Sequence, residues 1–504
     1  MKNLLLSIEL TFDLFIHIIN HLSMFVKVGF MLALCKFDPA EEGADGMAQK
    51  KNSRINLTEG PIFSSLLRFA IPILLGSIVT QLYNVADSII VGRFVSSDAL
   101  AAVSASGPVM SLINMFMIGL STGSNVVIAQ RMGAKDNEAL QKAVSTVAFL
   151  TVVCSLFITV VGLLVSRPLL NLLNTPQEIF SDARFYLIII YLGTTGNLIY
   201  QMGSGALRGM GDSSWPFYFL LLCSFLNIIL DLLAVLVLKW GVPGVALATT
   251  LAQTLSGIGV IIRLNRGGYG VKVRFRNIRP DRREAGKIIG IGLPAAIQNI
   301  GNAIANLCVQ SSVNYFGATF IAANSIVNKV DDVINIPVVA LSTALCTYVG
   351  QNMGLFRMDR IRKGINYSIL SLTVLGAGLC GILIGFRSIF PRIFTTDQAV
   401  IAIAADGLFI MSFQCLFHGT DRCLVNAMRG AGKSVVPMIT AQFGAFSRIP
   451  LAYLLGVRTG NWHGIFWALL IASFLRSAAI AIYYYGGGWK RAVRKFEQKY
   501  KESL

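Results

Sequence analysis

The chain is built from long runs of mostly apolar residues, each bounded by charges or by Gly and Pro. A helix of about 20 residues, at about 1.5 Å per residue, crosses the hydrocarbon core of a bilayer. Backbone polar groups find no water at that depth, so helix is the expected state, and the runs lack the alternation of β-barrel strands. The pattern predicts an all-α polytopic membrane protein with twelve transmembrane helices, near residues 66–91, 99–126, 141–164, 183–205, 215–238, 243–264, 287–308, 318–347, 364–386, 400–427, 437–457 and 463–485.

Composition excludes a soluble protein. Hydrophobic residues make up 54% of the 504 positions and charged residues 13%, whereas about a quarter of a soluble chain is charged. The eight cysteines fall mostly inside apolar runs, without C-x-x-C spacing, and are expected to be reduced residues of the core.

A net charge of +18 suits either a nucleic-acid partner or a membrane. Position decides between them. The segment before the first helix and every second connection carry 29 Lys and Arg, against 7 in the remaining connections. By the positive-inside rule both ends of the bundle are cytoplasmic, and we expect contact with the lipid bilayer and no nucleic-acid partner.

The first 46 residues are ambiguous. Leu4 to Leu34 is apolar but interrupted every fourth residue by Glu9, Asp13, His17 and His21, as in a helix lying in the membrane interface. It lacks the charged start and cleavage site of a signal peptide. Alternatively, Met47 opens an ordinary cytoplasmic start and is the natural initiator.

The chain matches itself at an offset of 221 residues. Gln130-Arg-Met-Gly133 meets Gln351-Asn-Met-Gly354, and Leu207-Arg-Gly-Met-Gly211 meets Met428-Arg-Gly-Ala-Gly432. Six helices per half make the halves parallel, which is an architecture of alternating access around a central cavity. The predicted organisation is an extension and cytoplasmic segment (1–59), two six-helix lobes (60–265 and 287–486), a basic linker (266–286) and a basic tail (487–504).

The repeated glycine motifs lie at the predicted cytoplasmic helix ends, where glycines permit turns and arginines cap carbonyls. We interpret them as hinge or closure elements. G-x-x-x-x-G-K-[ST] does not occur, so ATP is not an expected partner. The closure residues are Gln130, Gly133, Arg208, Gly211, Gln351, Gly354, Arg429 and Gly432.

Ionisable residues within the membrane are functional candidates because each costs about 2.5–3.5 kcal/mol on insertion scales. Asp87 lies deep in the first helix, and Asn227 and Asp231 share one face of the fifth. Thr249 and Thr250 supply hydroxyls on the sixth. Such oxygens suit a hard cation or a shared proton, although Asn227 and Asp231 could simply fix helix packing.

Other polar and aromatic positions are candidates for a substrate cavity, with local pairing or plain packing as the alternative. Lys329 can pair with the neighbouring Asp331 and Asp332, and Asp421 could face a cationic substrate. The predicted cavity residues are Asp331, Asp332, Asp421, Tyr83, Tyr200, Met202, Phe413 and Phe417.

The stretches FAIPILLGSIVTQLYNVADSIIVGRFVSSDALAAVSASGP, GLSTGSNVVIAQRMGAKD and GALRGMGDSSWPFYF resemble the multidrug and toxic compound extrusion (MATE) family in its bacterial branch. The resemblance covers about residues 60–485 and implies export of organic, often cationic compounds against Na⁺ or H⁺, without a cofactor, by a monomer in the bacterial plasma (inner) membrane. The family's cation site carries over to Asp87, Asn227, Asp231 and Thr249. The offset places Cys308, Arg448 and Ala452 opposite Asp87, Asn227 and Asp231, so we expect coupling in the first lobe alone.

Two other functions are alternatives to efflux. An enzyme would need a nucleophile, base or metal cluster near the membrane face, and the four histidines offer none outside the doubtful N-terminal segment, so we expect a protein that is not an enzyme. A flippase for a lipid-linked oligosaccharide or another lipid would favour a cationic central cavity. The deep charges are of both signs, namely Lys329, Arg422, Arg448 and Arg476 against Asp87, Asp231, Asp331, Asp332 and Asp421, and leave that alternative open.

Overall fold

A computed structural model describes residues 54–273, 279–489 and 491, and these ranges form helices and connections without a strand. The predictions for the first 46 residues, for Met47 and for most of the tail lie outside them. The first lobe contains α2 (Ile62–Phe94), α3 (Ser97–Gly133), α4 (Asn137–Leu172), α5 (Gln177–Gly209), α6 (Ser214–Leu232) with the π-helical turn η1 (Leu233–Val237), and α7 (Gly241–Arg266). The second contains α8 (Arg282–Asn314), α9 (Gly317–Gly354), α10 (Met358–Gly385), α11 (Ile389–Arg392), α12 (Gln398–Ser412), α13 (Cys415–Gly430), α14 (Val435–Ala452) with η3 (Tyr453–Val457), and α15 (His463–Tyr483) with η4 (Tyr484–Gly488).

The predicted fold class is confirmed. Each predicted span corresponds to one long helical element, with η1, η3 and η4 continuing their helices and α12 and α13 forming one element bent by 51°. Within the described residues, nine helices are long and apolar enough to span a membrane by themselves, or ten with the bent pair. The elements built on α5 and α14 complete the twelve; they fall short of that measure because polar residues interrupt them.

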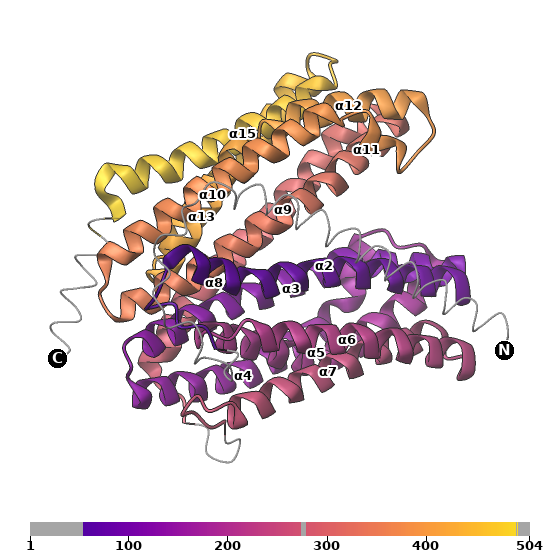
Figure 1. Cartoon of the computed structure of the whole chain (residues 1–504). Coiled ribbons are helices and arrows are strands. Elements are labelled where there is room, and N and C mark those ends of the chain that lie inside the picture. Colours follow the sequence, from indigo (N-terminus) through magenta and orange to yellow (C-terminus); the bar gives the residue numbers. More distant parts are fainter. Residues whose placement is uncertain (1–53, 274–278, 490, 492–504) are drawn as a thin grey trace.

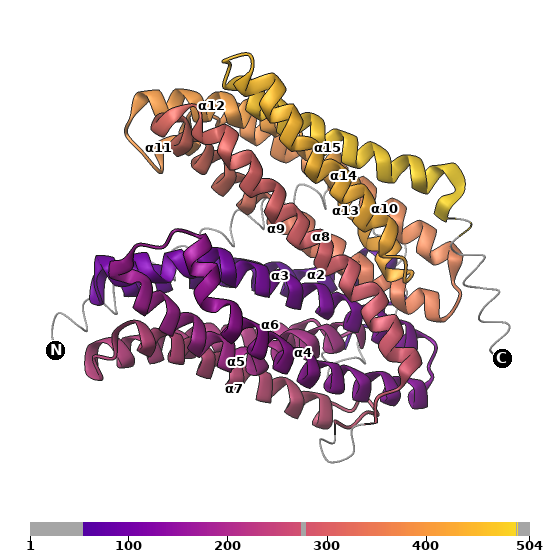
Figure 2. The ribbon, with the colours of Figure 1, turned by 180° about the vertical axis from the view of Figure 1, so that it is seen from behind.

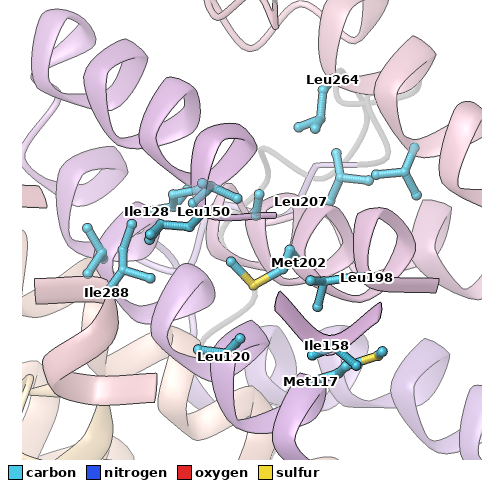
Figure 3. Packing of buried hydrophobic residues seen from close by; sticks show 14 of the residues in the cluster. Met117, Leu120, Ile128, Leu150, Ile158, Leu198, Met202, Leu207, Leu264 and Ile288 are labelled. Atoms are coloured by element: carbon cyan, nitrogen blue, oxygen red, sulfur yellow. The ribbon is translucent and has the colours of Figure 1, made fainter. Parts of the chain in front are cut away.

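The two bundles converge at one end of the molecule and diverge toward the other (Figures 1 and 2). Across the lobes, α3 packs on α8 and α2 on α9, pairs that the 221-residue offset makes equivalent. Inside the first lobe, Met117, Leu198 and Met202 pack in an apolar core between α3, α4 and α5 (Figure 3). Lipid tails are as apolar as such side chains, so close packing rather than water exclusion holds the bundle together.

The helices extend beyond the predicted spans because their polar ends remain helical outside the apolar stretch. The eighth span, predicted at 318–347, belongs to a helix that continues to Gly354. The predicted linker 266–286 overlaps both flanking helices, since α7 ends at Arg266 and α8 begins at Arg282. Asp281 is the N-cap of α8 and accepts hydrogen bonds from the amides of Arg283 (2.8 Å) and Glu284 (3.0 Å).

Candidate functional site

A cluster of acidic and polar side chains lies within the first lobe. α2 contributes Asp87, α6 contributes Asn227 and Asp231, and α7 contributes Thr249. The four-residue spacing on α6 places Asn227 and Asp231 on one helix face, and both are buried. The structure thus brings the four predicted cation-site residues together; their role in coupling stays a prediction.

Hydrogen bonds fix the geometry of this cluster. With its nitrogen toward Asp231, the Asn227 carboxamide donates to Asp231 Oδ2 across 2.8 Å and accepts from Thr249 Oγ1 across 3.1 Å. The reverse orientation makes only the contact with Thr249, at 3.1 Å, so the first is the chemically complete one. The carboxyl groups of Asp87 and Asp231 lie next to each other, and two neighbouring carboxylates repel unless a proton or a cation lies between them.

Each aspartate has one carboxyl oxygen that makes no hydrogen bond in the described part of the chain. Oδ1 of Asp87 and Oδ1 of Asp231 are buried and have no hydrogen-bond partner in the described part of the chain. Orphaned acceptors of this kind are costly unless a proton or a cation joins them. Together with Asn227 and Thr249, the cluster offers the oxygen ligands that a hard cation prefers.

Tyr83, a predicted cavity residue, lies beside this cluster. Its hydroxyl lies beside Thr249 and close to Asp87, one helical turn along α2. The phenol thus borders the acidic cluster, and its predicted place in a substrate cavity stays a prediction.

Five further predicted cavity residues are also placed elsewhere. Met202 is fully buried in the first-lobe core (Figure 3), and the Tyr200 hydroxyl donates to the carbonyl of Pro216 across 3.1 Å. Asp421 is buried against Arg476, with 2.8 Å between Oδ2 and Nη2. None of these side chains lines the cavity described below, and their role in substrate binding stays a prediction. Phe413 and Phe417 likewise pack edge to face against Phe409 and Phe474.

A cavity of about 600 Å³ lies in the second lobe, where α8, α9, α13, α14 and α15 face α2 of the first. Asp331 and Asp332, both predicted, line it. Lys329 makes no ion pair with them among the described residues; its Nζ lies 5.7 Å from the ring centre of Phe394. The sequence identifies Arg422, Arg448 and Arg476 as deep charges but assigns none of the other polar lining residues to a cavity. These further residues are Ser77, Gln81, Asn302, Asn306, Gln310, Asn324, Asn328, Asn335, Gln414, His418 and Ser473.

A sequence signal for this cavity existed. Asn302, Asn306 and Gln310 follow at intervals of four along α8, as do Asn324 and Asn328 on α9. Polar side chains repeated every four residues form a stripe on one face of a helix. Such a stripe in a membrane helix indicates a polar interior surface rather than lipid contact.

The predicted closure residues lie where the lobes converge. Gln130 Nε2 of α3 donates to the Gly430 carbonyl across 2.9 Å, and Gln351 Nε2 of α9 donates to the Gly209 carbonyl across 2.9 Å. The 221-residue offset relates the two bonds to each other. A Cβ on Gly133 would lie 1.9 Å from the Gln351 carbonyl oxygen, so only glycine permits this approach. The Arg208 guanidinium donates a hydrogen bond to the Ser121 hydroxyl, and the Arg429 guanidinium donates to the Gln298 side-chain oxygen. Gly211 and Gly432 have a positive φ. A Cβ on Gly354 would clash with the Gln130 carbonyl oxygen.

A buried carboxylate ties the linker to the same end. Asp212 pairs with Arg263 across 3.1 Å and accepts a hydrogen bond from the Tyr269 hydroxyl. Burial, and then the neighbouring Asp212, raise the pKa of Tyr269 above its ordinary value. Glu284 of α8 pairs in turn with Arg131 of α3. The linker region thus adds charged contacts to the closed end.

Two parallel six-helix bundles, closed at one end, with an acidic cluster in one and a polar cavity in the other, define a two-lobed membrane transporter. The MatE family model matches the chain twice, at residues 72–233 and 294–454. The chain belongs to this family, which confirms the resemblance. The two matches begin 222 residues apart, close to the repeat offset.

Individual relatives extend over most of the chain. "Probable multidrug resistance protein YoeA" of Bacillus subtilis is 28% identical over 445 residues, 85% of this chain and 95% of that protein. An "FAD transporter" of Shewanella oneidensis is 25% identical over 361 residues, 69% of this chain and 78% of that protein. A solved structure described as the outward-facing conformation of a multidrug resistance MATE family transporter shares the fold, with a TM-score of 0.81, 22% identity, and coverage of 89% of this chain and 100% of that one.

Proposed function

We propose that this protein is an efflux transporter that exports small organic compounds by antiport with Na⁺ or H⁺. The relatives named as multidrug resistance or export proteins support efflux of drug-like compounds. The observation that supports coupling is the acidic cluster, in which Asp87 and Asp231 lie next to each other and each has a buried oxygen without a hydrogen-bond partner in the described part of the chain. The equivalent positions in the second lobe hold no carboxylate, so the coupling ion is handled by one lobe.

The lobes carry the transport step by alternating access. By the positive-inside rule the end at which the lobes meet faces the cytoplasm, so the structure corresponds to the outward-open state in a bacterial plasma membrane. Entry of the external ion at the Asp87–Asp231 pair changes helix packing in the first lobe and favours release of the cargo. Inward opening then requires the bonds of Gln130 and Gln351 to break.

The test is transport in proteoliposomes under an imposed Na⁺ or pH gradient. Cargo of both charges is needed, so we would use ethidium, a lipophilic cation, and adenosine monophosphate (AMP), a polar anion. Asp87→Asn should abolish gradient-driven export, while Asp406→Asn, at a half-exposed carboxylate in the other lobe, should not. Export by Asp87→Asn at the wild-type rate would contradict the coupling role.

A second candidate function is a flippase for a lipid-linked oligosaccharide or another lipid with an anionic headgroup. It is favoured by one observation, the arginines that line the second-lobe cavity. Exchange of a fluorescent phosphatidic acid between leaflets, without efflux of any soluble cargo, would favour the flippase.

A further inference from the structure

The two lobes differ in their deep charges: the first-lobe cluster holds carboxylates alone, whereas the second-lobe cavity holds three arginines together with Asp331 and Asp332. The carboxylates Asp87 and Asp231 lie in the first lobe, whereas three arginines converge on the second-lobe cavity from three helices, Arg422 from α13, Arg448 from α14 and Arg476 from α15. At the repeat offset, Arg448 occupies the place of Asn227 in the acidic cluster. The second lobe therefore has a guanidinium where the first has the amide of its acidic cluster.

The three arginines differ in their ion pairs and hydrogen bonds. Arg476 pairs with Asp421 across 2.8 Å. Arg422 and Arg448 have no carboxylate within 4.0 Å in the described ranges, and the Nε of each is buried without a partner. Arg448 Nη1 donates to Asn306 Oδ1 across 3.0 Å, which satisfies hydrogen bonding but not charge. A guanidinium inside a membrane lobe that has no carboxylate in direct contact is costly, and an anionic ligand would reduce that cost.

The remaining walls suit a polar ligand. Amide side chains of α8 and α9, among them Asn302 and Gln310, line the cavity, and its aromatic content is limited to His418. A cavity for lipophilic cations would instead present aromatic faces or unpaired carboxylates. Asp331 and Asp332 on α9 also line the cavity and would repel a ligand that is anionic throughout, so its negative charge has to be confined to one group that the arginines can contact. The volume of about 600 Å³ is that of a small-molecule site.

We propose that this cavity binds a polar organic anion through a phosphate group held by Arg422 and Arg448, with the amides contacting its neutral part. The guanidinium fork matches phosphate oxygens in a bidentate arrangement, which a lysine could not provide. The inference rests on the proposed function in taking the bound compound as cargo. It replaces the organic cation expected from the family resemblance with a phosphate-bearing compound, either soluble or a lipid headgroup.

Equilibrium binding without a gradient tests the site. Wild-type protein in phosphatidylcholine nanodiscs should bind AMP at least about tenfold more tightly than adenosine, which lacks only the phosphate. Arg448→Gln and Arg422→Gln should each weaken AMP binding about tenfold or more and leave adenosine unchanged. Lys329→Gln is the matched control because it removes one positive charge from an exposed position of the same lobe outside the cavity, and it should bind AMP normally.

A second experiment, with a phosphate-bearing lipid, distinguishes a soluble ligand from a lipid headgroup. If a headgroup is the natural ligand, dioleoyl phosphatidic acid in the nanodisc should displace AMP and remain bound to wild type, but not to Arg448→Gln, in native mass spectrometry. Absence of binding by both AMP and phosphatidic acid, or equal binding by wild type and both Gln variants, would overturn the proposal. Arg448→Lys, which keeps the charge but not the fork, should bind AMP with intermediate affinity.

Failure of this inference is distinguishable from failure of the proposed function. Asp87→Asn should bind AMP as wild type does while losing gradient-driven export. If the arginine variants lose AMP binding while Asp87→Asn exports normally, the anion site is supported and only the coupling role of Asp87 is contradicted. A Gln variant that does not fold properly would show a lower thermal stability than wild type. In that case the AMP affinity of Arg448→Lys, compared with that of wild type, tests the site.

Discussion

Thr249 and Thr250 are adjacent hydroxyls on α7 with different surroundings. Thr249 bonds Asn227 in the acidic cluster, whereas Thr250 Oγ1 is buried without a partner and faces Gly193 of α5. Thr249→Val should therefore remove one hydrogen bond, worth about 1 kcal/mol, and reduce the apparent affinity for the coupling ion about fivefold. Thr250→Val, the matched control, should leave it unchanged. The measurement is the ion concentration for half-maximal export, and equal values for both variants would contradict a role for Thr249.

A single methyl group tests the contact between the lobes. Gly133→Ala places a Cβ 1.9 Å from the backbone oxygen of Gln351, and backbone cannot move aside cheaply. We expect the lobes to separate at this end and Cys346, buried near Gly430, to become accessible to a maleimide. Gly286→Ala on α8 adds the same methyl in open space and should leave Cys346 protected. Unchanged labelling of Cys346 in Gly133→Ala, followed by mass spectrometry, would argue against a tight closed end.

At the scale of elements, hydrophobic runs predicted the helices but not their irregularities. The bend between α12 and α13 and the π-helical turns η1 and η3 depend on how neighbouring helices pack, which residue type does not encode. η1 begins at Leu233 and η3 at Tyr453, nearly one repeat apart. The recurrence indicates that the turns belong to the lobe architecture rather than to one local sequence.

The start of α8 offers a prediction at this scale. The amides of Glu284 and Arg283 hold the pKa of Asp281 below its ordinary value. The ionised cap thus stabilises the helix above the carboxyl's unfolded pKa, and this stability is lost as the pH falls through the lowered folded pKa. Asp281→Ala should speed hydrogen exchange in the first turn of α8 about fivefold near neutral pH, for a cap worth about 1 kcal/mol. Asp281→Asn, which also caps, should keep the protection; equal exchange in both variants would contradict the assignment.

For the whole molecule, the sequence predicted what is local or repeated and missed what depends on facing surfaces. Twelve spans followed from apolar length, and the acidic cluster from the four-residue spacing of Asn227 and Asp231 together with the family pattern. The second-lobe cavity could not be assembled in the same way, because Arg422, Arg448 and Arg476 lie on three helices and meet only in the folded lobe. In the fold these arginines share the second lobe with Asp331, Asp332 and Asp421, whereas the polar cluster of the first lobe holds carboxylates without an arginine.

Alternating access makes a final prediction about the lobes as rigid bodies. Thr347 Oγ1 of the second lobe donates to Asn125 Oδ1 of the first across 3.1 Å, so cysteines at these positions lie within reach of a short, reducible bifunctional thiol reagent. In a background without native cysteines, bridging Asn125→Cys to Thr347→Cys should stop export, because the closed end can no longer open. Binding of AMP should persist, since the cavity lies away from this contact and needs no movement to fill. Reduction of the bridge should restore export.

The control pair lies within one lobe. His463 Nε2 and Asp406 Oδ2 are 3.5 Å apart on α15 and α12, so Asp406→Cys with His463→Cys can be bridged by the same reagent without joining the lobes. Rocking of rigid lobes predicts normal export from this bridged protein. Continued export with the lobes bridged would instead require a path for cargo that leaves the closed end intact. Loss of export in both bridged proteins would place the essential movement inside the second lobe, and would therefore contradict rigid-body rocking as the transport step.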